Sequence, residues 1–415
     1  MNHRMPALLA SFALACVCVS ASFPAAAWAS PLTLEAAIGL ALRANPALRA
    51  AGSEVAAQEG ALAQAGLLPN PELELLREGE RSSIRTTTAT LAIPIELGGK
   101  RAARIDAARQ ERDLAAIALE AARDRIRADT AAAFHDVLAA RERERMALEL
   151  VALAGRALHA AGKRVEAGTL SPLEETRARV ARGSARIEAL QAARDLEGAR
   201  IRLAALWAGD ARTLDIVAPH SAALPIAAPL ETLLARLDGS PAMRHARAQV
   251  GLRQALARVE RSRRAPDVNV IVGAQREGPD ARNRAVLGLA VPLPLFNRND
   301  GAVLDALRRV DKARDEADAE FARLRAELAQ AHAQLTAALA ECALAAHEVL
   351  PGAEEAQRAA SRGFELGKFG MAELLDAQRM LAQSRNQYLN AVLESHRAAA
   401  DIARLLGDAA ARENP

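Results

Sequence analysis

Aromatic side chains are the first thing that this sequence lacks: Phe, Trp and Tyr together make up 2% of its 415 residues. A compact globular core normally buries more of these rings, because each removes a large area from water. Hydrophobic residues nevertheless reach 51%, largely as alanine, and charged residues reach 25%. That combination is typical of long helices packed side by side. The composition therefore argues against ordinary globular domains and favours an extended, mainly helical protein.

Cysteine and one-sided charge are also scarce. Cys16 and Cys18 fall in the N-terminal segment, which leaves Cys342 alone and excludes a disulfide framework. The net charge is only +3, and no basic patch contains interleaved aromatic residues. Nucleic acid is therefore excluded as a partner.

Signatures of catalysis are missing as well. The sequence contains no nucleophile elbow, phosphate-binding loop or dinucleotide-binding motif. The histidines show no metal-ligand spacing, and each is expected on a solvated helix face: His135, His159, His220, His245, His332, His347 and His396. We therefore predict a protein that is not an enzyme and that holds no cofactor and no metal centre.

Long hydrophobic runs are confined to the N-terminus. Arg4, the apolar stretch 7–19 and Ala27-Trp28-Ala29 have the order of an export signal, so residues 1–29 are predicted to be a signal peptide. The apolar stretch is too short for a transmembrane anchor, and no later segment has 18 consecutive apolar residues. Cys16 leaves a second interpretation open, a lipoprotein signal.

The chain does contain one sequence pattern that occurs twice. Asn45-Pro46-Ala47-Leu48-Arg49 is echoed by Ser240-Pro241-Ala242-Met243-Arg244, 195 residues later. Ile93-Pro94-Ile95 matches Val291-Pro292-Leu293 at 198 residues, and Glu166-Ala167-Gly168 matches Glu365-Leu366-Gly367 at 199. These landmarks predict an internal duplication. We expect a first repeat at 30–208, an equatorial linker at 209–229, a second repeat at 230–407 and a C-terminal tail at 408–415.

Each repeat contains two short segments of period-two alternation, at about 71–96 and about 266–295. Their apolar positions coincide under the duplication and predict strands with one apolar face: Leu73, Leu75, Leu91, Ile93, Ile95, Val268, Val270, Val272, Leu287, Leu289, Val291 and Leu293. Four strands cannot close a barrel, and the smallest outer-membrane barrels have about eight. Three chains would supply twelve strands. A soluble sandwich edge, or a pair of capping hairpins, is the alternative.

Two very long helices follow the strands, at about 99–167 and about 301–366. The first contains no proline and carries heptad seams of small or apolar residues, interrupted by Glu144: Ile126, Ala133, Val137, Ala140, Ala147, Val151 and Leu158. Pro351-Gly352 should break or kink the second. Return helices are expected at 173–207 and 372–406. A periplasmic coiled-coil structural protein remains a competing interpretation of the helices alone.

Several motifs together resemble the TolC family of outer-membrane efflux ducts, over nearly the whole mature chain. They are Leu32-Thr33-Leu34-Glu35-Ala36-Ala37, Leu67-Leu68-Pro69-Asn70-Pro71, Glu96-Leu97-Gly98-Gly99-Lys100-Arg101, Pro292-Leu293-Pro294-Leu295-Phe296-Asn297-Arg298-Asn299 and Phe364-Glu365-Leu366-Gly367 with Glu373-Leu374-Leu375-Asp376-Ala377. The Gly-Gly-Lys-Arg and Asn-Arg-Asn elements are similar to the CzcC-like branch, which serves heavy-metal cation pumps.

The resemblance implies a mainly α fold with a small β part. Three chains would form a twelve-stranded β-barrel in outer-membrane lipid and a long periplasmic α-helical barrel. The homotrimer would dock on a periplasmic membrane-fusion adaptor and an inner-membrane efflux pump of the RND type. A duct for organic toxicants or drugs, or for type I secretion, is the alternative within the same family.

The same resemblance points to a gate at the periplasmic end. Glu373 and Asp376 share a face of the first helical turn and would form a ring of six carboxylates in a trimer, with Glu174 and Arg177 at the equivalent positions of the first repeat. Such a ring attracts cations. Acids that merely complement the helix dipole are the alternative. The expected adaptor-docking turns contain Gly168, Leu170, Ser171, Gly367, Phe369 and Gly370.

Overall fold

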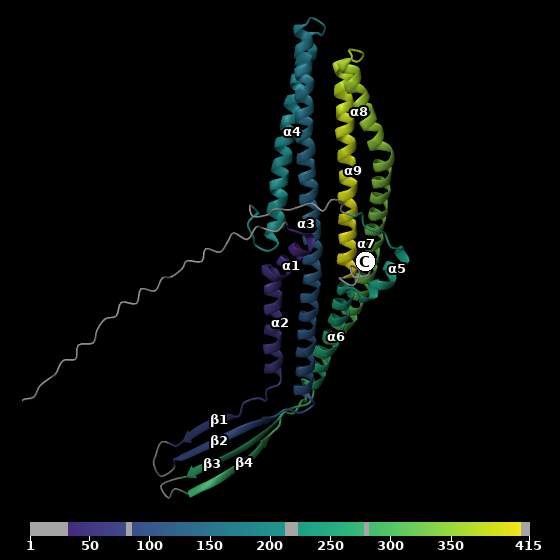
Figure 1. Ribbon diagram of the computed structural model, residues 1–415. Helices are drawn as coiled ribbons and strands as arrows, with labels where there is room; N and C mark the ends of the chain where they lie inside the picture. Colours follow the sequence, from purple (N-terminus) through teal and green to yellow (C-terminus); the bar gives the residue numbers. More distant parts are fainter. Residues whose placement is uncertain (1–31, 80–84, 212–222, 278–281, 408–415) are drawn as a thin grey trace, which may run out of the picture.

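The computed structural model describes residues 32–79, 85–211, 223–277 and 282–407 (Figure 1). The expected signal peptide, with Cys16, and the C-terminal tail lie outside these ranges. The first repeat contains α1 (Leu34–Ala44), α2 (Pro46–Ala65), β1 (Glu72–Glu78), β2 (Thr86–Ile95), α3 (Lys100–Glu166) and α4 (Pro172–Ala205). The second contains α5 (Leu230–Arg236), the 3₁₀ turn η3 (Leu237–Gly239), α6 (Pro241–Ser262), β3 (Val268–Glu277), β4 (Arg282–Ala290), α7 (Asp300–Leu344), the π-helical segment η4 (Ala345–Val349), α8 (Leu350–Glu365) and α9 (Met371–Leu406).

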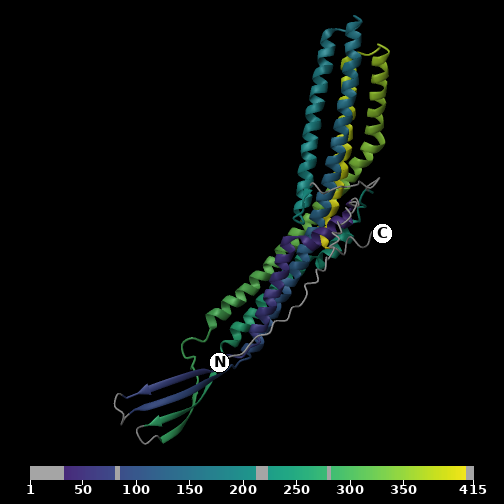
Figure 2. The same cartoon turned by 60° about the vertical axis from the view of Figure 1, so that its left-hand side comes forward.

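The molecule is a long bundle with the sheet at one end and, at the other, the two turns that join α3 to α4 and α8 to α9 (Figures 1 and 2). Helix α3 has 67 residues, which at about 1.5 Å per residue makes a rod of about 100 Å. Helix α2 packs along the half of α3 that is nearer the sheet, and α4 packs along the other half of α3, so two shorter helices cover one long helix. In the second repeat α6 and α9 cover α7 and α8 in the same way.

The duplication extends to single buried positions of the return helices. In α4 all buried residues except Ala204 follow the repeat: Ala178, Ala185, Leu196, Ala199 and Leu203. In α9 the residues exactly 199 positions later are also buried: Ala377, Ser384, Ser395, Ala398 and Ile402. The two repeats therefore use one packing scheme, with the same side of each return helix turned toward its long helix.

The π-helical segment η4 marks a one-residue insertion in the second repeat. Up to its first residue, Ala345, buried positions of the two long helices lie 198 apart, as in the pairs Thr130 with Leu328, Val137 with Leu335, Ala140 with Ala338 and Ala147 with Ala345. After it, the pairs Ala154 with Ala353 and Ala161 with Ala360 lie 199 apart. One extra residue is what a π-turn accommodates. Pro351 is the second residue after η4, and its ring would clash with the carbonyl four residues earlier in a regular helix. The break expected at Pro351-Gly352 is thus a widened turn that begins at Ala345, and the helix continues past it.

The helical core is built mainly from alanine and leucine, and none of the described helices has an apolar stretch long enough to cross a membrane. Of the expected seam in α3, Val137, Ala140 and Ala147 are buried. The other expected members are only half-buried: Ile126, Ala133, Val151 and Leu158. A straight helix drifts about 20° per heptad against a strict seven-residue repeat. Ala133 and Leu158 still pack against buried apolar clusters. The seam prediction was therefore wrong only at Ile126 and Val151, and the fully buried stripe includes neighbours such as Phe134, Ala154, Ala157 and Ala161.

The sheet is antiparallel in the order β1-β2-β3-β4, and its register joins the two repeats at β2 and β3. Leu73 lies opposite Leu91, Leu91 opposite Val272, and Val272 opposite Leu287, so one apolar row crosses all four strands. Leu287 is 80% exposed in the single chain. Strand β1 and strand β4 form two unpaired edges.

Strand β4 is shorter than the alternation predicts. It ends at Ala290, so Val291 and Leu293 lie outside it. Pro292 and Pro294 follow, and proline has no N–H to contribute to a ladder of hydrogen bonds.

Candidate functional site

In each repeat the same tight turn joins the long helix to the return helix, at the end of the bundle that is remote from the sheet. We call these the first tip turn (167–171) and the second tip turn (366–370). Gly168 has φ 72° and Gly367 has φ 73°, a left-handed conformation that favours glycine after a helix. The N–H of Thr169 donates to the carbonyl of Arg164 at 2.8 Å, and the N–H of Lys368 donates to that of Gly363 at 2.8 Å. The equal turn chemistry shows that the duplication reaches the tips.

Arg164 joins the two tips to each other. Its guanidinium donates to the carbonyl oxygen of Phe364 at 2.9 Å and lies 5.1 Å from the centroid of that ring. Phe364 packs in an apolar cluster with Ala161 of α3 and Met371 of α9. Sequence reasoning missed this link, because an arginine in the last turn of a helix is also a common partner of the helix dipole.

The expected gate residues Glu373, Asp376 and Arg177 meet at one cavity, which we call the tip groove. It has a volume of about 770 Å³ between α4 and α9, with Leu150 and Ala154 of α3 among its lining residues. Arg379 also lines it and was not expected there. Carboxylates and guanidinium groups therefore share this groove within one chain.

Glu174 makes its ion pair inside its own helix. It forms an ion pair with Arg177 on the same helix, with 2.8 Å between Glu174 Oε1 and Arg177 Nη1. Its other carboxylate oxygen is buried and has no hydrogen-bond partner within the described residues. The sequence places the two side chains three residues apart, and that spacing lets them pair within the helix.

Glu373 folds back toward the start of α9. A Cβ added at Gly370 would lie 2.8 Å from its Oε2 atom, and Gly370 supplies no capping side chain. An acid here complements the helix dipole. Glu373 and Asp376 are both exposed, so the dipole interpretation and the gate interpretation fit the same geometry.

Most of the expected docking residues lie at the surface of the tips. Gly168, Ser171, Gly367 and Gly370 are exposed, and Phe369 is 47% exposed. Ser171 also caps α4, because its hydroxyl accepts from the N–H of Leu173 at 3.3 Å. Leu170 instead is half-buried against the apolar cluster of the tips.

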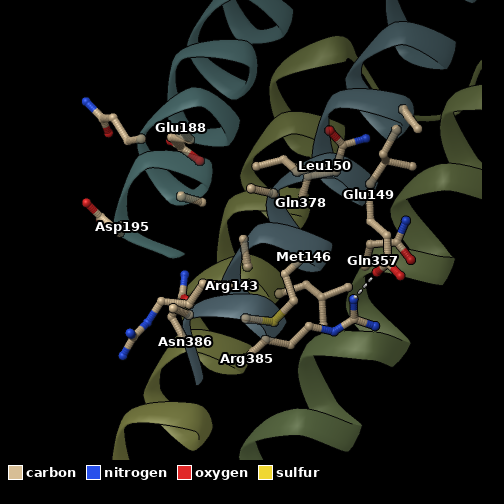
Figure 3. A pocket seen from close by; sticks show the side chains of 18 of the residues that line it. Arg143, Met146, Glu149, Leu150, Glu188, Asp195, Gln357, Gln378, Arg385 and Asn386 are labelled. Carbon is tan, nitrogen blue, oxygen red and sulfur yellow. Dashed lines mark hydrogen bonds and ion pairs between the residues drawn. The ribbon is translucent and has the colours of Figure 1, made fainter. Parts of the chain in front are cut away.

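A second groove of about 540 Å³ continues from the tip groove along α3, α4, α8 and α9 (Figure 3). Beside it, polar side chains join α3 to α9. Arg385 of α9 forms an ion pair with Glu149 of α3 at 3.3 Å, drawn as a dashed line in Figure 3. Arg143 donates to Asn390 at 2.7 Å, and further from the tips Arg397 pairs with Asp136 at 2.8 Å.

Two histidines contradict the expectation of solvated positions. The rings of His135 in α3 and His396 in α9 stack with centroids 3.9 Å apart and planes 12° from parallel. Burial, followed by repulsion from His396, lowers the pKa of His135 to about 4, and burial lowers the pKa of His396. His332 is half-buried, with its Nε2 atom 3.0 Å from the carbonyl oxygen of Ala228. The stacking of His135 on His396 was not predicted because the two residues are far apart in the sequence. Across the described residues, no group of three or more His, Cys, Asp or Glu side chains is placed to hold a metal ion.

Comparison with known proteins agrees with this architecture. The chain is 45% identical to the cobalt-zinc-cadmium resistance protein CzcC of Cupriavidus metallidurans, over 91% of each chain. It is 31% identical to the nickel-cobalt-cadmium resistance protein NccC of Alcaligenes xylosoxydans xylosoxydans, over 77% of this chain and 74% of that one. The crystal structure of the outer membrane protein VceC of Vibrio cholerae superposes with a TM-score of 0.76 at 20% identity, over 90% of this chain and 96% of that one.

The structural likeness confirms the predicted TolC-like fold class, and the duplication is visible in the family match itself. The model described as "Outer membrane efflux protein" matches residues 37–209 and matches a second time at residues 234–408. Each match contains a strand pair, a long helix and a return helix. Over both of its repeats, the chain belongs to the outer membrane efflux protein family.

Proposed function

We propose that three copies of this chain form the outer-membrane duct of a tripartite system that exports divalent heavy-metal cations. The exported substrate is inferred from the 45% identity, over 91% of both chains, to a protein named for cobalt, zinc and cadmium resistance. A second relative at 31% identity is named for nickel, cobalt and cadmium. The duct itself is passive, and an inner-membrane pump supplies the energy.

The sheet supports assembly from several copies. It has four strands, two unpaired edges and one apolar face. A sheet edge in lipid leaves backbone groups without partners, so only a closed barrel satisfies them. Three copies supply twelve strands, an even number within the range of outer-membrane barrels. The helical bundle then extends into the periplasm as the wall of a tube.

The tip turns suit a periplasmic adaptor. Gly168, Ser171, Gly367, Phe369 and Gly370 are exposed at the end that is furthest from the sheet. An adaptor that contacts this end would connect the duct to an inner-membrane pump of the RND type. Leu170 packs against the apolar cluster inside the tips and is not part of the proposed contact surface.

The gate would lie beside these turns. Glu373 and Asp376 of three copies make six carboxylates around one axis, and such a ring concentrates cations and repels anions. Arg177 and Arg379 in the same groove reduce this preference and bridge the acids when no cation is bound. Glu174 holds Arg177 in place through their ion pair.

Deletion of the gene tests the cargo. We expect the deletion strain to lose tolerance to zinc, cadmium and cobalt salts, and a plasmid copy of the wild-type chain to restore it. Tolerance to dyes and detergents should not change. Unchanged metal tolerance combined with new sensitivity to dyes would replace metal cations by organic toxicants as the cargo.

A further inference from the structure

A polar row crosses the apolar side of the sheet near its hairpins. Arg77 lies opposite Thr87, Thr87 opposite Arg276, and Arg276 opposite Asn283. We call these four residues the rim row. Residues directly opposite each other on neighbouring strands turn their side chains to the same face of a sheet. On every strand the rim row stands four residues from the apolar row that contains Leu73, and an even spacing keeps the side chains on one face.

The two faces of the sheet differ in charge. All acids of the four strands lie on the face opposite the rim row: Glu72, Glu74, Glu78 and Glu277. On the face of the rim row, the charged residues of the four strands are both arginines. Both are exposed, and within the part of the chain that the structure describes neither forms an ion pair. These two guanidinium groups are therefore available to an external anion.

No aromatic side chain within the four strands marks where the sheet leaves the membrane. Outer-membrane barrels have aromatic girdles at both interfaces, yet β1, β2, β3 and β4 contain no Phe, Trp or Tyr. The hairpin ends of the strands point away from the helical bundle (Figure 1), so in the proposed barrel they face the outside of the cell. Four residues at about 3.3 Å each place the rim row about 13 Å beyond Leu73 along the strand. The rim row therefore occupies the place of the outer girdle.

The side chains of the rim row suit phosphate groups above apolar chains. Arginine presents a planar fork of donors that binds phosphate through two hydrogen bonds. Thr87 lies between the two arginines and Asn283 lies beyond them, so neutral hydrogen-bonding groups complete the row. Neighbouring strands are about 4.8 Å apart, so the arginines stand about 10 Å apart. A disaccharide that carries a phosphate at each end spans a similar width.

The apolar rows beside the arginines decide between a free anion and a lipid. Leu75 is 71% exposed and Leu287 is 80% exposed on the same face. A free phosphate would contact only the arginines, whereas a lipid covers the leucines with its acyl chains as well. The outward-facing leaflet of the outer membrane is built from a phosphorylated glycolipid, which has both parts.

We infer that the rim row is a binding surface for the phosphate groups of this glycolipid, and that the apolar rows beside it contact the acyl chains of the same molecule. The inference rests on the proposed barrel and adds a lipid site to it. Three copies carry six such arginines around the barrel. Their contact with the headgroups fixes the level of the barrel in the membrane, as an aromatic girdle does elsewhere.

Lipid binding to the purified trimer tests the site. The protein in a non-ionic detergent is titrated with lipid A, with lipid A stripped of its phosphates, with phosphatidylglycerol and with inorganic phosphate, and native mass spectrometry measures what is bound. We expect lipid A to bind more tightly than the other three. Arg77→Gln/Arg276→Gln should weaken the binding of lipid A about tenfold or more, because each substitution removes charge-assisted hydrogen bonds. The matched control is Arg284→Gln, near the same end of the sheet but on the opposite face, which should bind lipid A like the wild type.

Three results would overturn the site. The first is undiminished binding of lipid A by Arg77→Gln/Arg276→Gln. The second is equal binding of dephosphorylated lipid A, which would assign the contact to the acyl chains alone. The third is equal affinity for phosphatidylglycerol, which would reduce the row to a surface for any anionic lipid.

A second variant keeps the test decisive if the glutamine variant does not assemble. Arg77→Lys/Arg276→Lys keeps both positive charges but loses the planar fork, so it should form the trimer and bind lipid A with intermediate affinity. Sedimentation separates the site from the proposed duct. A wild-type chain that forms no trimer would overturn the duct, whereas a stable trimer without selective binding of lipid A would overturn the rim-row site alone.

Discussion

At the scale of single residues, the acidic side chains at the tips give the most direct test of the proposed gate. Replacement of Glu373 and Asp376 by alanine removes all six carboxylates of the proposed ring, while both side chains are exposed and contribute little to packing. We expect wild-type channels in planar bilayers to prefer cations and to be blocked by multivalent cations. The double variant should lose both properties.

The matched control for the gate is Glu166→Ala/Glu365→Ala, which removes two exposed acids at equivalent positions beside the tip turns. This variant should conduct like the wild type, because these acids do not line the tip groove. If the Glu373→Ala/Asp376→Ala channel keeps the ion selectivity and the cation block of the wild type, those acids act only as partners of the helix dipole.

The stacked histidines predict a dependence of stability on pH. The pKa of His135 is lowered to about 4 in the folded chain, so below an ordinary histidine pKa of about 6.5 the unfolded chain binds protons that the folded chain does not. Stability from this pair is therefore complete above about pH 6.5 and falls as the pH drops toward 4, by about 1–3 kcal/mol. Thermal unfolding from pH 7.5 to pH 4.5 should show a smaller fall in His135→Gln/His396→Gln.

Carboxylate groups also take up protons at acidic pH, so the relevant quantity is the difference between the variant and the wild type in how far stability falls. His347 is exposed, and His347→Gln should leave the pH profile unchanged. Equal profiles for all three proteins would mean that the stacked rings are solvated in the assembled molecule.

Tight packing between α3 and α4 determines what the helices tolerate. Ala140 is 5% exposed and belongs to a cluster with Val137, Leu196 and Leu203, and Ala133 packs against that cluster. Leucine at either position overfills the contact, and each substitution should cost about 1–3 kcal/mol. Thermal stability of the purified protein measures this cost. Ala326 is exposed on α7, so Ala326→Leu should be close to neutral.

The helices and strands themselves were largely predictable, and the exceptions have physical causes. The long helix expected at 99–167 runs from Lys100 to Glu166, because uninterrupted helix formers and glycine turns mark its ends. The heptad seam was misplaced at Ile126 and Val151, since the strict seven-residue template ignores the drift of a straight helix. The π-turn before Pro351 and the end of β4 depend on local backbone geometry that hydrophobic periodicity does not encode.

The candidate site was less predictable than the fold. The position of Glu373 and Asp376 on one helical face follows from their spacing, and both line one groove. Their proximity to Arg177, the link from Arg164 to Phe364 and the stacked histidines all join residues from different helices. A single sequence carries no signal for such pairs unless the duplication repeats them.

At the scale of the whole molecule, the single chain is an incomplete object. Its sheet has two unpaired edges and its α4 face is uncovered. Analytical ultracentrifugation in detergent should give the mass of three chains, because the strands of one chain cannot close a barrel. A monomeric wild type would contradict the assembly.

The bare edges of the sheet also constrain how the protein is made. An apolar face flanked by unpaired strand edges invites pairing with any passing chain, so an exported copy waiting alone in water is prone to aggregate. The helical bundle carries no such hazard, because its exposed faces are charged as well as apolar. Helices of separate copies can therefore meet first, hold the strand pairs at a common level and leave barrel closure to the last step, at the lipid surface. Biogenesis would then begin at the end of the molecule that is furthest from the membrane.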